Sequence, residues 1–146
     1  KLPKYLKPTS DNRIDDAIEG ARLTSGPLFD EAYERSVLER SIERDPDRNG
    51  SARQTAAITA SPDRTKALHE LTVPTLVVHG LADRLVLPSG GVATAKAIPG
   101  SRLLMFPDMG HNLPPKYWDE VIDAIVANAA RATGIATIDA GRVQPA

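Results

Sequence analysis

The chain has 146 residues, near the usual size of one domain, and 41% of them are hydrophobic and 25% charged. Its formal net charge of −1 provides no positive field for phosphate, so we do not expect nucleic acid as a partner. No apolar run approaches the roughly 18 residues that cross a bilayer, so no membrane span is predicted. The absence of cysteine excludes disulfides, thiolate nucleophiles and cysteine-based metal sites. We expect a cytoplasmic protein, although the lack of cysteine does not by itself decide the compartment.

The first 60 residues predict helices only. Apolar residues recur at helical spacing in residues 10–23, and a second helix follows in residues 30–45. An alanine-rich third helix is expected in residues 51–60. These helices have narrow apolar faces, so we expect them to lie on top of another layer and not to form a core of their own.

The pattern changes to alternating helices and strands after residue 64. Residues 75–79 are apolar on consecutive positions, which is typical of a strand buried on both faces in a parallel sheet. A helix of about ten residues, closed by Pro99, separates it from a second strand at 101–106. A long helix is predicted from about Pro114 to Arg131, with the proline in its first turn. This order predicts an α/β fold built on a βαβ unit.

Two such strands are not expected to be stable alone. The apolar side chains at Leu76, Val77, Val78, Leu103 and Leu104 would cover both faces of the pair. Each one left exposed forgoes roughly 1.5–3 kcal/mol of burial, against a total domain stability of about 5–15 kcal/mol. We therefore expect another segment to supply further strands. The alternative is that the helices in residues 10–60 fold back and cover the sheet.

An acid and an imidazole follow the two predicted strands. Asp83 comes four residues after the first strand and His111 five residues after the second. The carboxyl ends of parallel strands meet at one edge of a sheet, where ligands bind, and neighbouring strands lie about 4.8 Å apart. We therefore expect the carboxylate to reach the imidazole. In a catalytic triad this pair fixes the histidine tautomer and leaves Nε2 as the general base.

Two longer stretches extend this motif. The segments "VPTLVVHGLADRLV" and "IPGSRLLMFPDMGHNLPPKYWDEVIDAI" resemble the last part of an α/β-hydrolase, in particular the small serine esterases of the aclacinomycin-methylesterase and proline-iminopeptidase-like group. The resemblance covers roughly residues 52–130. It implies that Asp83 is the triad acid and His111 the base, and that residues 1–60 are a helical cap segment. Residues 61–134 would then be the C-terminal part of the catalytic domain and 135–146 a tail.

The nucleophile that this family needs is absent. It sits in a G-x-S-x-G turn between a strand and a helix. The serines at positions 25, 51, 89 and 101 lie in "TSGPL", "NGSAR", "LPSGG" and "PGSRL", and none fits that motif. The glycine-rich stretch that would form an oxyanion hole is missing as well. We expect both in the upstream half of the same hydrolase, on the same gene product or on a second chain, so this chain alone is not expected to be a competent enzyme.

Each candidate residue also has a simpler interpretation. Asp83 could be only a turn residue, and His111 could only cap the helix that follows it. Asp108 is a competing partner for His111, while His79 is interpreted as a structural strand-end residue. The sequence contains no H-x-x-x-H or H-x-H spacing, so we expect no metal. The resemblance implies no cofactor.

Apolar residues near the expected site are candidates for contact with a substrate. They are Leu28, Phe29, Val86, Leu113 and Trp118. The alternative for Trp118 is that it only packs the last helix against the sheet. The resemblance implies a small-molecule carboxylic ester as substrate. Two alternatives stay open: an aspartate nucleophile, as in dehalogenases and epoxide hydrolases, and a truncated, non-catalytic module for binding or assembly.

Overall fold

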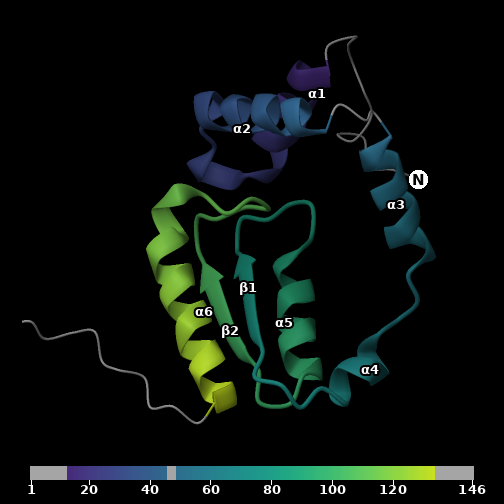
Figure 1. Cartoon of the computed structure of the whole chain (residues 1–146), viewed down its shortest axis with the longest axis vertical. Coiled ribbons are helices and arrows are strands. Elements are labelled where there is room, and N and C mark those ends of the chain that lie inside the picture. The colour runs from purple at the N-terminus through teal and green to yellow at the C-terminus, as the bar shows by residue number, and fades with distance from the viewer. Residues whose placement is uncertain (1–12, 46–48, 134–146) are drawn as a thin grey trace, which may run out of the picture.

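The computed structural model describes residues 13–45 and 49–133, which form a mixed α/β fold as predicted (Figure 1). Its elements are, in chain order, α1 (Arg13–Thr24), η2 (Gly26–Leu28), α2 (Glu31–Arg44), α3 (Gly50–Ala60), α4 (Thr65–His69), β1 (Leu76–Gly80), α5 (Pro88–Ala97), β2 (Arg102–Phe106), η3 (Pro115–Tyr117) and α6 (Trp118–Thr133). None of the described helices is both long enough and apolar enough to cross a membrane. The predicted tail at 135–146 lies outside the described residues.

The two strands pair in parallel, which confirms the βαβ prediction. Leu76 lies opposite Arg102 and Gly80 opposite Phe106, so the two five-residue strands pair over their full length. The first strand begins and ends one residue later than predicted. Among the described residues the sheet contains these two strands only, so each strand has one unpaired edge there.

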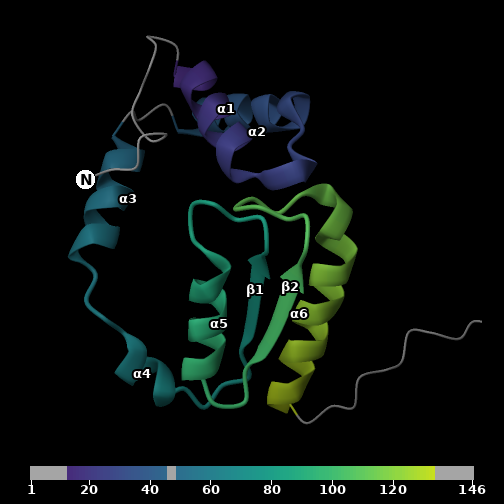
Figure 2. The ribbon, with the colours of Figure 1, turned by 180° about the vertical axis from the view of Figure 1, so that it is seen from behind.

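Helices α5 and α6 enclose the strand pair. Figures 1 and 2 show β1 and β2 between these two helices from the front and from behind. The core is a cluster of Phe106, Met109, Tyr117 and Val121. The rings of Phe106 and Tyr117 lie 4.0 Å apart between centroids. This cluster joins the end of β2 to the start of α6 and so holds the loop between them, residues 107–114.

Helices α1 and α2 lie over the carboxyl ends of the strands and not across the faces of the sheet (Figure 1). The alternative in which the helices of residues 10–60 cover the sheet is therefore wrong for the part that the structure describes. The two helices pack on each other, bury Ile18, and share ion pairs between Arg35 and Asp15 (3.0 Å) and between Arg22 and Glu31 (2.5 Å). They form a small unit placed directly above the ends of the strands.

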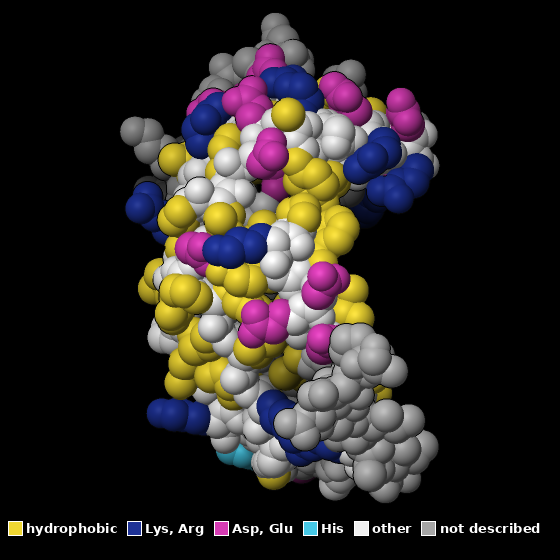
Figure 3. Space-filling model, turned by 90° about the vertical axis from the view of Figure 1, so that its left-hand side faces the viewer, with side chains coloured by type: hydrophobic (Ala, Val, Ile, Leu, Met, Phe, Trp, Pro, Cys, Tyr) yellow, Lys and Arg dark blue, Asp and Glu magenta, His cyan; other side chains and the backbone are white. Residues whose placement is uncertain are grey.

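Much apolar surface stays open to solvent. Along α6, Trp118, Ile122, Ile125 and Val126 form a continuous stripe, and Val126 is 60% exposed. Figure 3 views the α6 side of the molecule and shows hydrophobic side chains gathered there. In α3 almost every described side chain is exposed, including that of Ile58 at 68%. The long apolar helix predicted from the sequence is thus present, but only part of its apolar surface is buried.

The predicted start of the last helix is wrong by four residues. Pro114 has an extended backbone (φ −71°, ψ 150°), Pro115 begins the short 3₁₀ turn η3, and α6 begins only at Trp118. The reason is local, because a residue that precedes proline is disfavoured in the helical region. Pro114 precedes Pro115 and therefore stays extended.

Candidate active site

Asp83 lies in a tight turn directly after β1. One of its oxygens, Oδ1, accepts hydrogen bonds from the backbone N–H groups of Leu85 (2.8 Å) and Val86 (2.9 Å). An aspartate that bonds the backbone two and three residues ahead is a common way of forming such a turn. The turn interpretation of Asp83 is therefore correct, but it uses only one of the two carboxylate oxygens.

His111 lies in the loop after β2, which the turn after β1 and the end of α1 hold from two sides. Ala82 donates its backbone N–H to the carbonyl of Met109 (3.0 Å), which ties the two strand-end loops together. His111 donates its own backbone N–H to the carbonyl of Thr24 (2.8 Å), at the end of α1. The loop after β2 is thus fixed both to the turn after β1 and to the end of α1.

Two glycines permit this close packing of backbone. A Cβ atom added at Gly80 would collide with the carbonyl groups of Met109 and Gly110. A Cβ atom added at Gly110 would collide with the backbone of Thr24 and Ser25. Because the opposing atoms belong to the backbone, they cannot turn away as a side chain would. Glycine is therefore required at both positions for the loops to meet.

The second oxygen of Asp83 accepts a hydrogen bond from His111. Nδ1 of His111 lies 2.9 Å from Oδ2 of Asp83. The carboxylate is buried, with 5% of its side chain exposed, whereas the imidazole is 45% exposed. An ionised carboxylate can only accept, so Nδ1 carries the hydrogen and Nε2 is left with its lone pair. The predicted contact is confirmed, while a catalytic role for either residue stays a prediction.

The hydrogen bonds keep the buried carboxylate ionised. Burial by itself raises the pKa of Asp83, but the hydrogen bond from His111 and those from the backbone of Val86 and Leu85 outweigh it, so the pKa lies below its ordinary value. An ionised acid beside Nδ1 stabilises an imidazolium when Nε2 takes up a proton. The pair can therefore act as a general base with a fixed tautomer.

The competing acid, Asp108, has other partners. Its carboxylate accepts hydrogen bonds from Nζ of Lys116 (2.7 Å) and from the hydroxyl of Tyr117. These contacts join the loop after β2 to η3. Asp108 therefore supports the loop that carries His111, and the imidazole itself binds Asp83.

Three of the predicted substrate-contact residues have exposed side chains close in sequence to the pair. Val86 closes the Asp83 turn and is 45% exposed. Leu113 and Trp118 follow His111, and the indole N–H of Trp118 donates to the carbonyl of Leu113 (3.2 Å). All three present apolar surface to solvent, and a role for them in binding a substrate stays a prediction.

The other two predicted contact residues lie where the chain turns from α1 into α2. Leu28 packs against the core cluster, and Phe29 lies under the guanidinium group of Arg22, 4.8 Å from the ring centroid. Their present contacts are those of structural residues. A role for them in binding a substrate stays a prediction.

The site has two further contacts, one of them with a distant part of the chain. The amide nitrogen of Asn112, beside His111, donates to the carboxylate of Glu34 in α2, 78 positions away, while the amide oxygen of Asn112 is buried with no partner among the described residues. His79 approaches Asp83 as well, with Nε2 3.6 Å from Oδ2. No local sequence pattern indicated that Glu34 contacts the site. For His79, the predicted position at the end of the first strand was the available signal.

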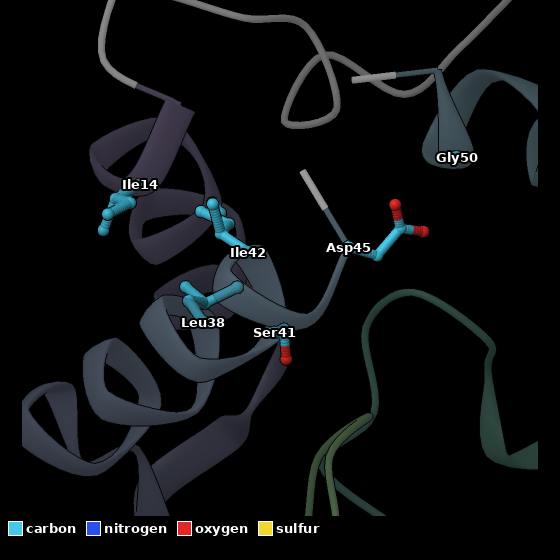
Figure 4. Close-up of a pocket in the computed structure, with 7 residues that line it drawn as sticks. Ile14, Leu38, Ser41, Ile42, Asp45 and Gly50 are labelled. Atoms are coloured by element: carbon cyan, nitrogen blue, oxygen red, sulfur yellow. The ribbon is translucent and has the colours of Figure 1, made fainter. Parts of the chain in front are cut away.

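A groove of about 290 Å³ lies away from the pair. It is lined by Ile14, Ala17, Leu38, Ser41, Ile42, Asp45 and Gly50, from α1, α2 and the start of α3 (Figure 4). The hydroxyl of Ser41 is bonded to the carbonyl of Val37 (2.8 Å), and most of the lining is apolar. The groove contains neither residue of the Asp83–His111 pair.

Comparison with known proteins leaves the family open, since no family model matches the chain. Within residues 13–45 and 49–133, no group of three histidine or acidic side chains is arranged to hold a metal ion. The chemistry of the site thus has to be argued from the Asp83–His111 pair itself.

Proposed function

We propose that this chain is the C-terminal portion of a serine hydrolase of the α/β-hydrolase fold, which cleaves a carboxylic ester. The observation that carries the proposal is the 2.9 Å hydrogen bond from His111 to Asp83. It joins a buried carboxylate to a partly exposed imidazole at the carboxyl ends of two neighbouring parallel strands. The resemblance of residues 52–130 to that family supports the same assignment.

The reaction would follow the order of a serine triad. Nε2 of His111 removes the proton from a serine hydroxyl as the hydroxyl oxygen attacks the ester carbonyl, and Asp83 stabilises the imidazolium that forms. The imidazolium then gives its proton to the departing alcohol, leaving an acyl-enzyme. His111 next takes a proton from water, which attacks the acyl group, and returns it to the serine as the acid leaves.

The serine and the oxyanion-hole donors would come from an upstream segment or a companion chain. The open apolar surface supports this part of the proposal. The stripe on α6 lacks burial, Leu103 in β2 is 38% exposed, and among the described residues each strand has one unpaired edge. Full burial of an exposed side chain of this kind contributes roughly 1.5–3 kcal/mol, and covering these partly exposed ones would contribute a fraction of that. Another polypeptide layer would therefore both stabilise this portion and bring the nucleophile to the rim of the sheet.

The proposal predicts what accompanies this chain in its native source. Immunopurification with an antibody to residues 64–133, followed by intact-mass measurement, should find either a longer polypeptide or a bound second chain. A fluorophosphonate probe should label a serine outside the present 146 residues. Replacing His111 by alanine should abolish both the labelling and ester turnover, because the serine loses its base.

Three outcomes would count against the proposal. A folded, unaccompanied 146-residue species that is not labelled would indicate a non-catalytic module. Turnover of alkyl halides or epoxides without fluorophosphonate labelling would indicate an aspartate nucleophile. Near-normal ester turnover by the His111→Ala protein would remove the role of His111 as base.

A further inference from the structure

A second imidazole lies against the acid. His79 is the fourth residue of β1, and its side chain is only 12% exposed. Its side chain lies against Gly91 in α5, where an added Cβ atom would approach Nδ1 to 2.7 Å and Cγ to 2.8 Å. The ring is therefore held in place by a neighbour that is small enough only as glycine.

The hydrogen-bond partner of His79 fixes its tautomer. Nε2 lies 2.9 Å from the backbone carbonyl of Val86. A carbonyl oxygen can only accept, so Nε2 must carry a hydrogen. Both backbone groups of Val86 are thus hydrogen-bonded. Its N–H donates to Oδ1 of Asp83, and its carbonyl accepts from His79.

The same N–H group faces the oxygen that binds His111. Nε2 of His79 is 3.6 Å from Oδ2 of Asp83, and Nδ1 of His111 is 2.9 Å from that atom. At 3.6 Å the contact is electrostatic and is not a full hydrogen bond. Oδ2 therefore has a hydrogen-bond donor at 2.9 Å and a second, polarised N–H group at 3.6 Å, and both favour the position of Oδ2 that the backbone bonds to Oδ1 already support.

We propose that His79 is a positioning residue, which holds the Asp83 turn and aims Oδ2 at the imidazole of His111. This inference rests on the proposed function for its meaning, because it concerns the acid of the same pair. It assigns to His79 a role that acts through Asp83 and not on a substrate. A residue that merely packs α5 on β1 would have no such effect on His111.

Nuclear magnetic resonance of the histidine rings in the full 146-residue chain tests the proposal. Long-range proton–nitrogen spectra should show His79 with its hydrogen on Nε2 and His111 with its hydrogen on Nδ1. The Nδ1 proton of His111 should resonate far downfield, as expected for an imidazole proton in a hydrogen bond to a buried carboxylate.

One glycine substitution perturbs His79 without removing a polar group, and a substitution of the neighbouring glycine is its matched control. Gly91→Ala pushes against the imidazole, whereas in Gly90→Ala the new Cβ atom meets only Cγ1 of Val86 at an ordinary 3.4 Å. Both lie in the first turn of α5, so the gain in helix propensity is similar. We expect Gly91→Ala to abolish the downfield His111 signal and Gly90→Ala to retain it.

Substitution of His79 itself distinguishes the effect of its N–H group from the effect of its side-chain volume. His79→Leu should lose the downfield signal, while His79→Gln, whose amide can still donate to the Val86 carbonyl, should restore at least half of its intensity. Circular dichroism establishes that each variant is folded. If His79→Leu does not fold, the role of His79 is tested by the tautomer of wild-type His79 and by the His111 signal of the two glycine variants.

The possible failures are distinguishable. A downfield His111 signal that survives Gly91→Ala and His79→Leu overturns the role of His79 but leaves the proposed hydrolase intact. Loss in Gly91→Ala with retention in folded His79→Leu assigns the effect to helix packing and also overturns it. A wild-type His111 with no hydrogen held on Nδ1 would overturn both this inference and the proposed function.

Discussion

Replacing Asp83 by asparagine tests what the buried carboxylate contributes to the folded chain. The wild-type side chain accepts three hydrogen bonds, from His111 and from the backbone of Leu85 and Val86. Asparagine has nearly the same volume and keeps one oxygen for the two backbone groups, but its amide nitrogen can only donate. The charge-assisted bond from Nδ1–H of His111 is therefore lost, and the amide can meet Nδ1 only when the imidazole takes its other tautomer. A hydrogen bond to a charged group contributes about 1.5–3 kcal/mol. We therefore expect Asp83→Asn to lower the free energy of unfolding by about 2 kcal/mol at pH 7.

The same variant should show a characteristic dependence on pH. Burial raises the pKa of Asp83, yet its hydrogen bonds bring the folded pKa below the ordinary value. The folded chain then binds this proton less readily than the unfolded chain, so the carboxylate stabilises the fold above the unfolded pKa of about 3.9. Its contribution is lost as the pH falls through the folded pKa. The difference between wild type and variant should hold down to about pH 5 and shrink below about pH 4.

Urea unfolding followed by circular dichroism measures both effects. Asp123→Asn is the matched control, because Asp123 is exposed in the middle of α6 and the same change there should stay within about 0.5 kcal/mol. Equal stability of Asp83→Asn and wild type at pH 7 would refute the reasoning. So would a difference that grows as the solution is acidified.

Three further predictions concern the surroundings of the pair. Gly110→Ala should lower the free energy of unfolding by about 3 kcal/mol, because the new Cβ atom collides with the backbone of Thr24; urea unfolding as stable as wild type would contradict this. Glu34→Ala should lower the free energy of unfolding by about 1–3 kcal/mol, because it removes the acceptor for Asn112. Hydrogen exchange in the loop of residues 107–114 should become faster, and an unchanged rate would show that the contact does not stabilise the loop. Ile125→Glu should leave this chain within about 0.5 kcal/mol of wild type but should prevent co-purification of a companion polypeptide; undiminished co-purification would place that partner elsewhere.

The pairing of acid and base illustrates how far local patterns reach. Strand length and loop length place Asp83 and His111 at one edge of a parallel sheet, because parallel strands end on the same side. The position of both residues thus follows from short stretches of sequence. The contact between Glu34 and Asn112 does not, because these residues are 78 positions apart and meet only when α2 lies over the strand ends. Such a contact depends on tertiary packing, which no periodicity encodes.

Exposure was a second limit of local patterns. The apolar stripe of α6 is visible in the sequence, and a helix of that kind is normally expected to be covered. The structure buries Val121 at 5% exposure and leaves Ile125 at 53%. Hydrophobic spacing identifies a face that favours burial, but whether something covers it depends on what lies beside the helix.

The sequence by itself determined the order of helices and strands, the parallel pairing and the edge at which a carboxylate and an imidazole emerge. These features follow from periodicity, turn residues and the direction of parallel strands, all of which act over a few residues. Only the tertiary structure decided the 2.9 Å approach of Asp83 and His111, the contact of His79 with the Val86 carbonyl and the glycine contacts that let the loops meet. Those distances depend on how separate segments pack in space, and packing is settled by the whole fold at once.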